Sequence, residues 1–590
     1  MKTRAPGTDA RDVIQKDDIM NTKRGRVAAV SASGGLLRMA SAALAAAGAA
    51  AAAFSRAHAG QPARERSPQL GADAWTDGDG QPWTAERLRD ILRIHLNGHR
   101  VIVVSNREPR IHDWNDAGEI AVRYPASGLV TALEPVMRAC SGVWVAHGSG
   151  TADRAASDPS GRVELSAGDS SFRLRRVWLT EAEERGYYYG FANQALWPLC
   201  HLAHTRPVFR RADWHAYQLV NARFAEAVAD EADCDDPIVL VQDYHLALVP
   251  ALLRARLPKA TILTFWHIPW PNVDRLSICP HHDALLDGLL GSSIVGFQTP
   301  CDCRHFCDGV SRHLEARIDR DDLAIDYRRR TTMVRAYPIS IEWPNRWTAS
   351  APAVADCRRS VRGELGLPND VPIVLSVDRL DYTKGIEERL LSAEGVLERG
   401  TRVAFVQVAT PSRVRIDEYE RLGRRVRADV ERINTRFGRE PFQPVVFLNR
   451  HLEPPDVFRF FRAADVCYVS SLHDGMNLVA KEFVAARDDW QGVLVLSRFA
   501  GAARELTDAL IVNPYDLDGV ADVLTEALAM SAEEQGDRMR ALGAAVSERN
   551  IFRWAGLMLL DAAHLRRAAS AGRRALWVRR RDLRPTRREG

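Results

Sequence analysis

The chain has 590 residues, of which 46% are hydrophobic and 26% are charged, and its formal net charge is +4. It is too long for one typical domain, so we expect two large domains with extensions, and the composition is that of a globular protein. Nine cysteines over this length exclude a disulfide-rich scaffold.

The positive charge is concentrated at the two ends of the chain. Residues 1–60 carry nine Lys and Arg against four Asp, and residues 566–590 carry ten Arg against one Asp and one Glu. The body between them is therefore acidic, and we expect no nucleic-acid partner for it. We interpret the basic ends as solvated tails, with contact to nucleic acid or anionic lipid as the alternative.

The first 80 residues show no sustained amphipathic period, so we predict a disordered or Ala-rich extension there. A basic lead, Arg4 to Arg26, is followed by an Ala-rich run, Met39 to Phe54, and by Ala57-His58-Ala59. This order resembles a signal peptide, although Arg38 interrupts the apolar stretch and alanine is weakly hydrophobic. No later stretch is apolar enough and long enough to span a bilayer.

Beyond residue 80, strand and helix patterns alternate. The first element is an amphipathic helix over 84–97 with Thr84 as its N-cap. Strands are predicted at 101–105, 238–241, 261–266, 293–297, 373–377, 403–408, 445–448, 466–470 and 493–497. Such alternation predicts an α/β fold with parallel sheets covered by helices.

We expect two such sheets, with the break near residues 338–344. This division predicts an N-terminal domain over 81–343 and a C-terminal domain over 344–548. A final helix over 549–567 and an Arg-rich tail over 568–590 complete the chain.

Two cations follow the predicted strand 373–377. Arg379 and Lys384 stand between that strand and a helical segment over 386–398. An arginine fork and a compact lysine charge can together hold a diphosphate. The alternative is a solvated loop with two surface cations.

A second polar loop, residues 473–477, follows the predicted strand 466–470 and precedes a helix. Asp474, Gly475 and Asn477 lie in this loop, and Glu482 comes five residues after Asn477. Open α/β sheets bind ligands at the carboxyl ends of their strands, and a helix N-terminus favours anions. The pattern suits a ligand with sugar hydroxyls at one end and a nucleotide at the other. The alternative is an ordinary strand–loop–helix corner.

A cysteine-rich segment lies further towards the N-terminus. Cys301, Cys303, His305 and Cys307 are close in sequence, but their spacing is not a standard zinc pattern and the segment 300–314 is predicted to be a helix. We therefore predict no metal site there.

Several long motifs in register make this chain resemble the trehalose-6-phosphate synthases, a retaining glycosyltransferase family. They are VIVVSNRE at 101–108, LWP at 196–198, VQDYHL at 241–246, FWHIPWP at 265–271, YPISIE at 337–342, SVDRLDYTKG at 376–385, TPSR at 410–413, HDGMNLVAKE at 473–482 and SRFAGAARE at 497–505. The resemblance covers roughly residues 99–565. It implies the GT-B architecture, in which two Rossmann-like domains face each other across a cleft and a C-terminal helix crosses back to the first domain.

The resemblance implies a donor site made mainly by the second domain. Arg379 and Lys384 would bind the diphosphate and stabilise the charge of the leaving group, Glu482 would hold the ribose, and Asp474 would accept hydrogen bonds from glucose. The other implied donor residues are Gly128, His267, Gly475, Met476, Asn477, Leu478 and Val479.

The resemblance also implies an acceptor site. Arg107, Tyr188, Trp197 and Arg413 would hold a phosphate, and Asp243 would hydrogen-bond the acceptor sugar. Two guanidinium groups, a phenol and an indole N–H supply the convergent donors that a phosphate needs.

The implied reaction transfers glucose from UDP-glucose, or another NDP-glucose, to glucose 6-phosphate with retention of configuration. Arg379, Lys384, Asp243, His267 and Asp474 would be the catalytic residues, without a metal or another cofactor. Attack would come from the front face, and the leaving phosphate would take the acceptor proton. Two alternatives stay open: a synthase that uses glycerol 3-phosphate as the acceptor, and a homologue that binds sugar phosphate without catalysis.

Because nucleotide sugars and sugar phosphates are cytosolic, we expect a cytoplasmic enzyme, and we also expect a homo-oligomer. A weak membrane anchor that faces the cytosol, through residues 28–54, is the alternative location.

The motifs depart from the family pattern at five positions. Ser127 stands in the early glycine pair, Gln242 begins the family's HDYH, Ser340 replaces a glycine, Asp378 replaces a frequent glutamate, and His473 stands where arginine is common. None of these changes removes a predicted phosphate ligand.

Overall fold

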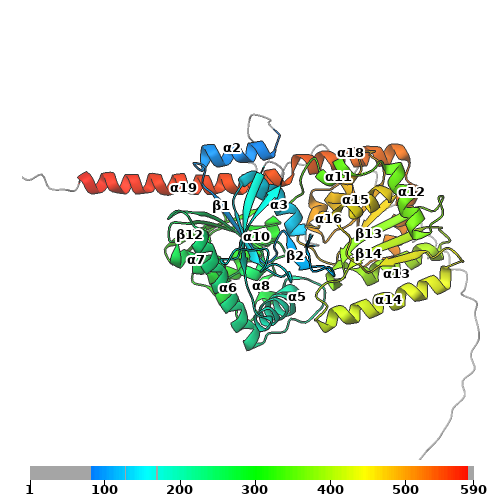
Figure 1. The fold of residues 1–590 in the computed structure, drawn as a ribbon, viewed down its shortest axis with the longest axis horizontal. Helices are drawn as coiled ribbons and strands as arrows, with labels where there is room; N and C mark the ends of the chain where they lie inside the picture. The colour runs from blue at the N-terminus through cyan, green and yellow to red at the C-terminus, as the bar shows by residue number, and fades with distance from the viewer. Residues whose placement is uncertain (1–81, 126–127, 168–169, 583–590) are drawn as a thin grey trace, which may run out of the picture. The chain divides into compact units, whose positions relative to one another are not determined.

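The computed structural model describes residues 82–125, 128–167 and 170–582 (Figure 1). These residues all belong to one compact unit. The N-terminal extension with its signal-like pattern, the departure at Ser127 and the end of the Arg-rich tail lie outside the described residues.

A ten-stranded sheet occupies the N-terminal half, in the order β10-β11-β12-β9-β8-β7-β1-β4-β6-β5. Neighbouring strands from β12 to β6 in this order run parallel, and antiparallel strands add to both edges. The strands are β1 (Val101–Ser105), β4 (Val143–His147), β5 (Arg162–Ala167), β6 (Ser170–Val177), β7 (Ile238–Gln242), β8 (Thr261–Phe265), β9 (Ile294–Phe297), β10 (Arg317–Asp319), β11 (Ala324–Tyr327) and β12 (Arg330–Ala336).

The four strands predicted in this half are the buried ones at its centre: β1, β7, β8 and β9. Their runs of apolar residues are typical of parallel strands covered on both faces. The prediction missed β4, although it is also central and mostly buried. It also missed β6, β12, the antiparallel edge strands and the hairpin of β2 (Ile111–Trp114) and β3 (Ile120–Arg123), because these strands are short or are interrupted by polar residues.

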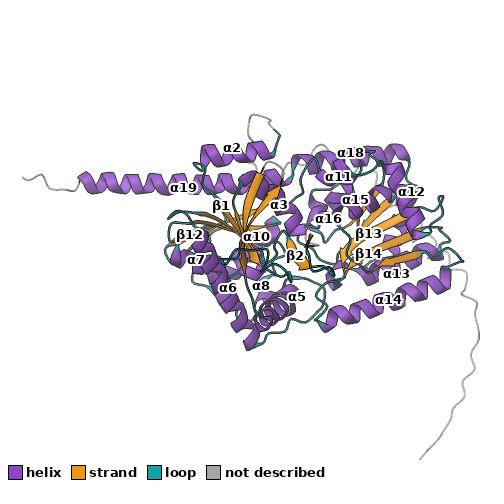
Figure 2. Ribbon diagram, in the orientation of Figure 1, coloured by secondary structure: helices purple, strands orange, loops and turns teal. Residues whose placement is uncertain are grey.

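A six-stranded parallel sheet follows, in the order β15-β14-β13-β16-β17-β18. Its strands are β13 (Ile373–Arg379), β14 (Ala404–Thr410), β15 (Val445–Leu448), β16 (Val466–Val469), β17 (Val493–Ser497) and β18 (Leu510–Val512). The first five were predicted, and only the three-residue β18 was missed. Helices lie on both sides of β13 and β14 (Figure 2).

The helices of the first half are α2 (Ala85–His95), α3 (Gly128–Cys140), α4 (Glu181–Glu184), α5 (Trp197–Cys200), α6 (Arg211–Glu231), α7 (Val249–Arg256), α8 (Val273–Leu276), α9 (His282–Leu289) and α10 (Pro300–His313), with a π-helix over Arg185–Leu196. Those of the second half are α11 (Arg346–Ser350), α12 (Val354–Leu365), α13 (Ile386–Glu398), α14 (Asp417–Phe437), α15 (Pro454–Ala463), α16 (Leu478–Ala486), α17 (Leu517–Ala529), α18 (Ala532–Glu548) and α19 (Ile551–Asp582). The Thr84 hydroxyl accepts the Arg87 N–H, which confirms the predicted N-cap of α2. Within the described part of the chain, no helix is long and apolar enough to cross a membrane.

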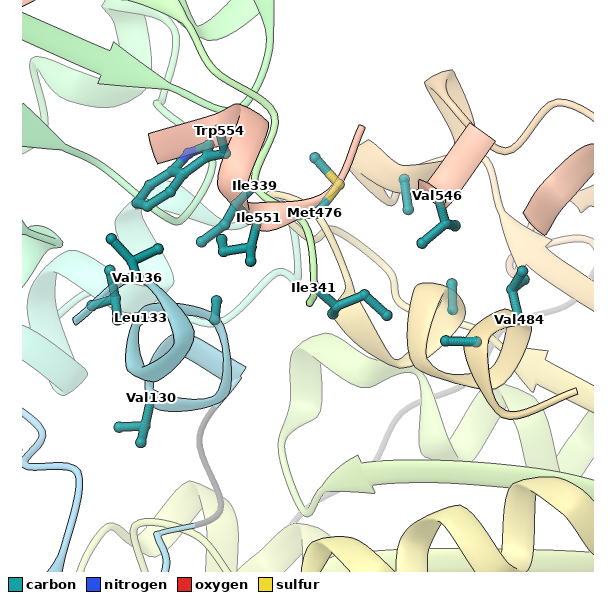
Figure 3. Close-up of a cluster of buried hydrophobic side chains, with 14 of the residues drawn as sticks. Val130, Leu133, Val136, Ile339, Ile341, Met476, Val484, Val546, Ile551 and Trp554 are labelled. Carbon is teal, nitrogen blue, oxygen red and sulfur yellow. The ribbon is translucent and has the colours of Figure 1, made fainter. Parts of the chain in front are cut away.

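One apolar cluster links the two sheets. Ile339 and Ile341, from the segment after β12, lie between α3 and α16, as Figure 3 shows. The cluster continues through Ile551 and Trp554 of α19. Because a continuous buried core resists separation of its parts, this cluster stabilises the relative position of the sheets.

The last described helix, α19, packs against the first sheet. The Trp554 ring meets Phe265 of β8 edge-on, at 5.1 Å between centroids, and Arg566 pairs with Asp236 at 2.5 Å. The helix was predicted to end at residue 567 but runs to Asp582. The predicted domain boundaries themselves stay predictions.

A buried lysine joins α16 to the linking segment. The Lys481 ammonium donates to the Ile339 carbonyl oxygen at 2.8 Å and pairs with Glu505 at 2.6 Å. Its side chain is 1% exposed. Burial lowers the pKa of Lys481, although the Glu505 carboxylate opposes this shift. The lysine thus fixes α16 to the segment that connects the sheets.

We predict that Lys481→Met lowers the free energy of unfolding by about 3 kcal/mol. Among the described residues it leaves the largely buried Glu505 carboxylate with Arg549, at 3.8 Å, as its ion-pair partner. The shift of the urea midpoint measures this loss. Arg538→Met is the control: it removes an exposed pair with Glu534 and should cost less than about 1 kcal/mol. Equal, small shifts in both variants would show that the buried pair does not matter.

Candidate active site

A cavity of about 340 Å³ lies where loops after strands of both sheets meet. It receives residues that follow β1, β7 and β8 of the first sheet and β13, β14 and β16 of the second. Fifteen of the sixteen predicted site residues line it: Arg107, Gly128, Tyr188, Trp197, Asp243, His267, Arg379, Lys384, Arg413, Asp474, Met476, Asn477, Leu478, Val479 and Glu482. Their roles stay predictions, but the structure brings them together in one place.

Three of these residues have backbone angles that only glycine adopts easily. The φ angles are +73° at Asp243, +49° at Arg413 and +78° at Asn477. Such conformations cost about 1–3 kcal/mol each and persist where the surroundings enforce them, often at functional sites. All three lie in loops after strands β7, β14 and β16, and all three line the cavity.

Three arginines surround one buried phenol. The Arg107 guanidinium donates to the Tyr188 hydroxyl at 2.6 Å, and Arg413 and Arg379 lie near it. Burial alone would raise the pKa of Tyr188, but these three positive charges outweigh it and lower that pKa. A buried phenol whose pKa falls reports a strongly positive potential, which is the environment that binds an anion. We call Arg107, Tyr188, Arg379 and Arg413 the anion centre.

Trp197 forms the floor of the anion centre. Its ring lies 3.9 Å from the Arg413 guanidinium and 5.6 Å from that of Arg379, measured to the ring centroid. Stacking on an aromatic face stabilises a guanidinium without occupying its N–H groups. The indole Nε1 of Trp197 is buried and has no hydrogen-bond partner among the described residues.

Arg413 is held from behind by groups that the sequence analysis missed. It pairs with Asp381 at 2.9 Å, and both side chains are almost fully buried. It also donates to the Tyr419 hydroxyl, and that hydroxyl donates to Asp381 at 3.1 Å. Burial would raise the pKa of Asp381, but Arg413 outweighs it and the pKa is lowered, so the partner stays charged. Asp381 lies in the same motif as Arg379, which was the available signal.

The second cationic part of the cavity is Lys384. Its ammonium pairs with Asp474 at 2.5 Å. Asn477 and Ser471 also donate to Asp474, each at 3.2 Å. Burial would raise the pKa of Asp474, but Lys384 outweighs it and the pKa is lowered. The carboxylate is therefore a fixed hydrogen-bond acceptor.

Asn477 caps α16, because its side-chain oxygen accepts the Ala480 N–H at 3.2 Å. Leu478 and Val479 form the first turn of this helix and line the cavity. N–H groups in a first helical turn have no partner within the helix and favour negative charge. The α16 N-terminus thus adds neutral donors beside Lys384.

Glu482 lies in the same helix and also lines the cavity. Burial raises the pKa of Glu482 to about 7. The cavity wall includes a group of apolar side chains: Val377, Leu452, Pro454, Val457 and Phe458. A single carboxylate at an apolar slot is suited to hydroxyls beside a flat ring.

On the first-sheet side, Asp243 and His267 lie side by side. An Asp243 carboxylate oxygen accepts the backbone N–H of His267 at 3.2 Å. Burial raises the pKa of Asp243 to about 7 and lowers the pKa of His267 to about 3. His267 is therefore neutral at physiological pH and exchanges hydrogen bonds rather than charge.

Gly475 is the one predicted site residue that does not line the cavity. A Cβ there would lie 2.2 Å from the His267 carbonyl oxygen. The loop after β16 and the loop after β8 thus touch through backbone at this point, and only glycine permits the contact. Its role is to bring the two loops together.

Further polar residues that line the cavity were not predicted. They are Asn106, Thr131, Tyr244, His245, Gln298, Asp378, Thr410 and His451. Asp378 pairs with the buried Arg389 at 2.8 Å, and His473 accepts the Leu202 N–H at 3.2 Å across the two halves. Ser340 is fully buried.

In the cysteine-rich segment, Cys303 and Cys307 are buried in an apolar core, and the Cys301 Sγ lies 3.7 Å from the His305 Nε2.

Known proteins match this chain over the same region. The sequence model of Glycosyltransferase family 20 matches residues 99–564. The chain belongs to glycosyltransferase family 20. The predicted family and GT-B fold are thereby confirmed, and with them the prediction of a retaining glycosyltransferase.

A trehalose-6-phosphate synthase of Mycobacterium sp. (strain KMS) is 40% identical over 470 residues, which cover 78% of this chain and 94% of that one. A crystal structure of a UDP-forming α,α-trehalose-phosphate synthase from Burkholderia xenovorans, in complex with glucose-6-phosphate, has a TM-score of 0.68 and 33% identity, and covers 78% of this chain and all of that one. An E. coli structure bound with UDP-2-fluoro glucose has a TM-score of 0.68 and 33% identity, over 79% and 99% of the two chains.

We predict that Gly475→Ala lowers kcat/KM at least tenfold, because the added methyl group must push the two loops apart, and shifts of about 1 Å at reacting groups can cost a hundredfold. Steady-state kinetics of the glycosyl-transfer reaction measure this loss of kcat/KM. Gly363→Ala in α12 is the control, because nothing lies within 4 Å of its Cβ position. Wild-type kinetics in Gly475→Ala would contradict the close contact.

Proposed function

We propose that this protein is an α,α-trehalose-6-phosphate synthase that transfers glucose from UDP-glucose, or another NDP-glucose, to glucose 6-phosphate with retention of configuration. The observation that supports it most is the anion centre, in which residues of both sheets surround the Tyr188 hydroxyl with positive charge. The relatives named above carry this activity in their names.

The donor side of the proposal uses the second sheet. Lys384, Arg379 and the N-terminus of α16 supply positive charge and N–H donors to a diphosphate, and Glu482 accepts from ribose hydroxyls. Charge builds up on the diphosphate as its bond to glucose breaks, so fixed cations there lower the barrier. Asp474, held by Lys384, orients the glucose hydroxyls.

The acceptor side uses the anion centre. Arg107, Arg413, Tyr188 and Trp197 donate to the phosphate of glucose 6-phosphate, and Asp243 accepts from its sugar hydroxyls. A phosphate dianion suits this centre better than a neutral sugar, because it compensates the positive charge. Binding the phosphate therefore fixes the attacking hydroxyl beside the donor.

The carboxylates of the cavity fit front-face attack. Asp474 is engaged by Lys384, and the raised pKa of Asp243, about 7, leaves much of it protonated at neutral pH. Asp243 and Asp474 therefore do not form the pair of free carboxylates that retaining hydrolases place on either side of the scissile bond. The leaving phosphate can instead take the proton from the acceptor hydroxyl.

A cytoplasmic location and a homo-oligomer belong to this proposal and stay predictions. The same holds for the membrane anchor through residues 28–54, which is the alternative location.

Nucleotide release tests the proposal. The protein is mixed with UDP-glucose or GDP-glucose, and with glucose 6-phosphate or glycerol 3-phosphate. Release with glucose 6-phosphate, with trehalose 6-phosphate recovered, is the expected result and identifies the donor. Release only with glycerol 3-phosphate would favour the other synthase. Ligand binding without release would favour a non-catalytic sugar-phosphate-binding protein.

We predict that Arg379→Ala and Lys384→Ala each lower kcat at least a hundredfold, because each removes a charge that stabilises the departing diphosphate. The release assay measures this loss. Arg425→Ala is the control: its exposed pair with Glu387 lies outside the cavity, so its kcat should be unchanged. Wild-type turnover in either cavity variant would refute the donor assignment.

We predict that affinity for the nucleoside diphosphate falls as the pH drops below about 7, where the Glu482 carboxylate takes up a proton and loses acceptor capacity for the ribose. Calorimetric titration from pH 8 to pH 5.5 measures this change in affinity, and we expect up to about a tenfold rise in Kd for each pH unit.

The raised pKa of Glu482 affects folding in the opposite direction. Its protonated form stabilises the native state at acidic pH, and this contribution to the free energy of unfolding is lost as the pH rises through about 7. Glu482→Gln should remove the pH dependence of binding, and an unchanged slope in that variant would contradict the role.

A further inference from the structure

The ring of His267 is fixed by the residue that precedes Asp243. The His267 Nε2 lies 2.8 Å from the Gln242 side-chain oxygen, at the end of β7. The ring also meets Phe265 edge-on, at 4.6 Å between centroids. Gln242 itself is 1% exposed, so its amide is held inside the core. Position 242 was noted in the sequence as a departure from the family's HDYH motif, without a role.

The peptide of His267 is fixed as well. Asp243 accepts its N–H at 3.2 Å, and the Gln298 amide donates to its carbonyl oxygen at 3.2 Å. Gln298 cannot turn its amide around without loss, because its side-chain oxygen accepts the Ile339 N–H at 3.0 Å. With the backbone and the ring held in this way, and with the Gln242 side-chain oxygen facing Nε2, the position of the imidazole proton can be assigned.

Chemistry decides that position. A neutral imidazole carries its proton on one nitrogen and a lone pair on the other. An amide oxygen can only accept, so the bond to Gln242 requires the proton on Nε2. The lone pair is then on Nδ1, and His267 is one of the residues that line the cavity.

We propose that Gln242 is a positioning residue that holds His267 in the Nε2-protonated tautomer, so that Nδ1 accepts a hydrogen bond from a hydroxyl of the donor sugar. The identity of the ligand that carries this hydroxyl rests on the proposed function, whereas the assignment of the tautomer does not. In this arrangement both His267 and Asp474 are hydrogen-bond acceptors. Each therefore orients a sugar hydroxyl that acts as a donor.

The arrangement has a local cost that supports a functional reason for it. The Gln242 amide nitrogen is buried and has no hydrogen-bond partner among the described residues. A buried unpaired donor costs about 1–3 kcal/mol, so a purely structural site would favour an apolar side chain here. The histidine of the family's HDYH could serve in the same way, because a ring-nitrogen lone pair also accepts the His267 proton.

Three variants separate positioning from packing. Gln242→Met keeps the volume but removes the acceptor. Gln242→His restores an acceptor. Thr264→Val, in the neighbouring strand β8, is the matched control. It removes another buried side-chain hydrogen bond, 2.7 Å long, between Thr264 and Ser292.

The first readout is solid-state NMR of the protein labelled with ¹⁵N-histidine, where His267→Gln identifies the His267 signals. We expect a protonated Nε2 and an unprotonated Nδ1 in the wild type and in Thr264→Val, and loss of this pattern in Gln242→Met. A protonated Nδ1 in the wild type, or an unchanged pattern in Gln242→Met, would overturn the proposal. This readout needs no substrate, so it stands even if the proposed function fails.

The second readout is kinetic. We expect Gln242→Met to lower kcat with NDP-glucose about tenfold or more, with the KM for glucose 6-phosphate unchanged. Gln242→His should recover activity to within about threefold of the wild type, and Thr264→Val should keep it. Equal losses in Gln242→Met and Thr264→Val would show that Gln242 acts only through stability.

Discussion

The positive charge around the Tyr188 hydroxyl is the constraint on which the rest of this structure depends. Arg107 comes from the loop after β1, whereas Arg379 and Arg413 follow β13 and β14 of the other sheet. Like charges this close repel one another, and the repulsion is stronger for buried side chains than for exposed ones. The sheets must therefore be held together by other forces if the anion centre is to exist.

The structure supplies those forces at several places. Asp381 compensates Arg413 from behind, and Trp197 stacks beneath it. The apolar cluster through Ile339 and Ile341 links the sheets, and Lys481 secures α16 to the same segment. Under the proposed function, an acceptor phosphate at the anion centre would add the remaining compensation, so acceptor binding and correct placement of the two sheets would favour one another.

Much of this arrangement could be predicted from the sequence, for reasons that differ between its parts. Central parallel strands such as β7 and β13 are buried on both faces and therefore appear as apolar runs. The cations Arg379 and Lys384 directly follow one of these strands, which places them at the ligand-binding edge of a sheet. Arg107, Tyr188 and Trp197 depended on the family resemblance, because nothing local brings a π-helix and a strand end together.

What could not be predicted depends on contacts between segments distant in sequence. Asp381 holds Arg413 from 32 residues away, and Gln242 meets the His267 ring from 25 residues away. The close packing of Gly475 on the His267 carbonyl could not be seen in the sequence either, and its expected donor contact stays a prediction. The edge strands β10 and β11 were missed because half-exposed antiparallel strands carry polar residues that mask their pattern.

The most direct measurement compares glucose with glucose 6-phosphate as acceptors, in the wild type and in Arg107→Ala. If the anion centre binds the acceptor phosphate, the wild type should prefer glucose 6-phosphate by about a thousandfold or more in kcat/KM. Arg107→Ala should then shrink this preference at least tenfold, by raising the KM for glucose 6-phosphate while leaving turnover of glucose unchanged. An equal loss with both acceptors would contradict the assignment of the anion centre to the phosphate.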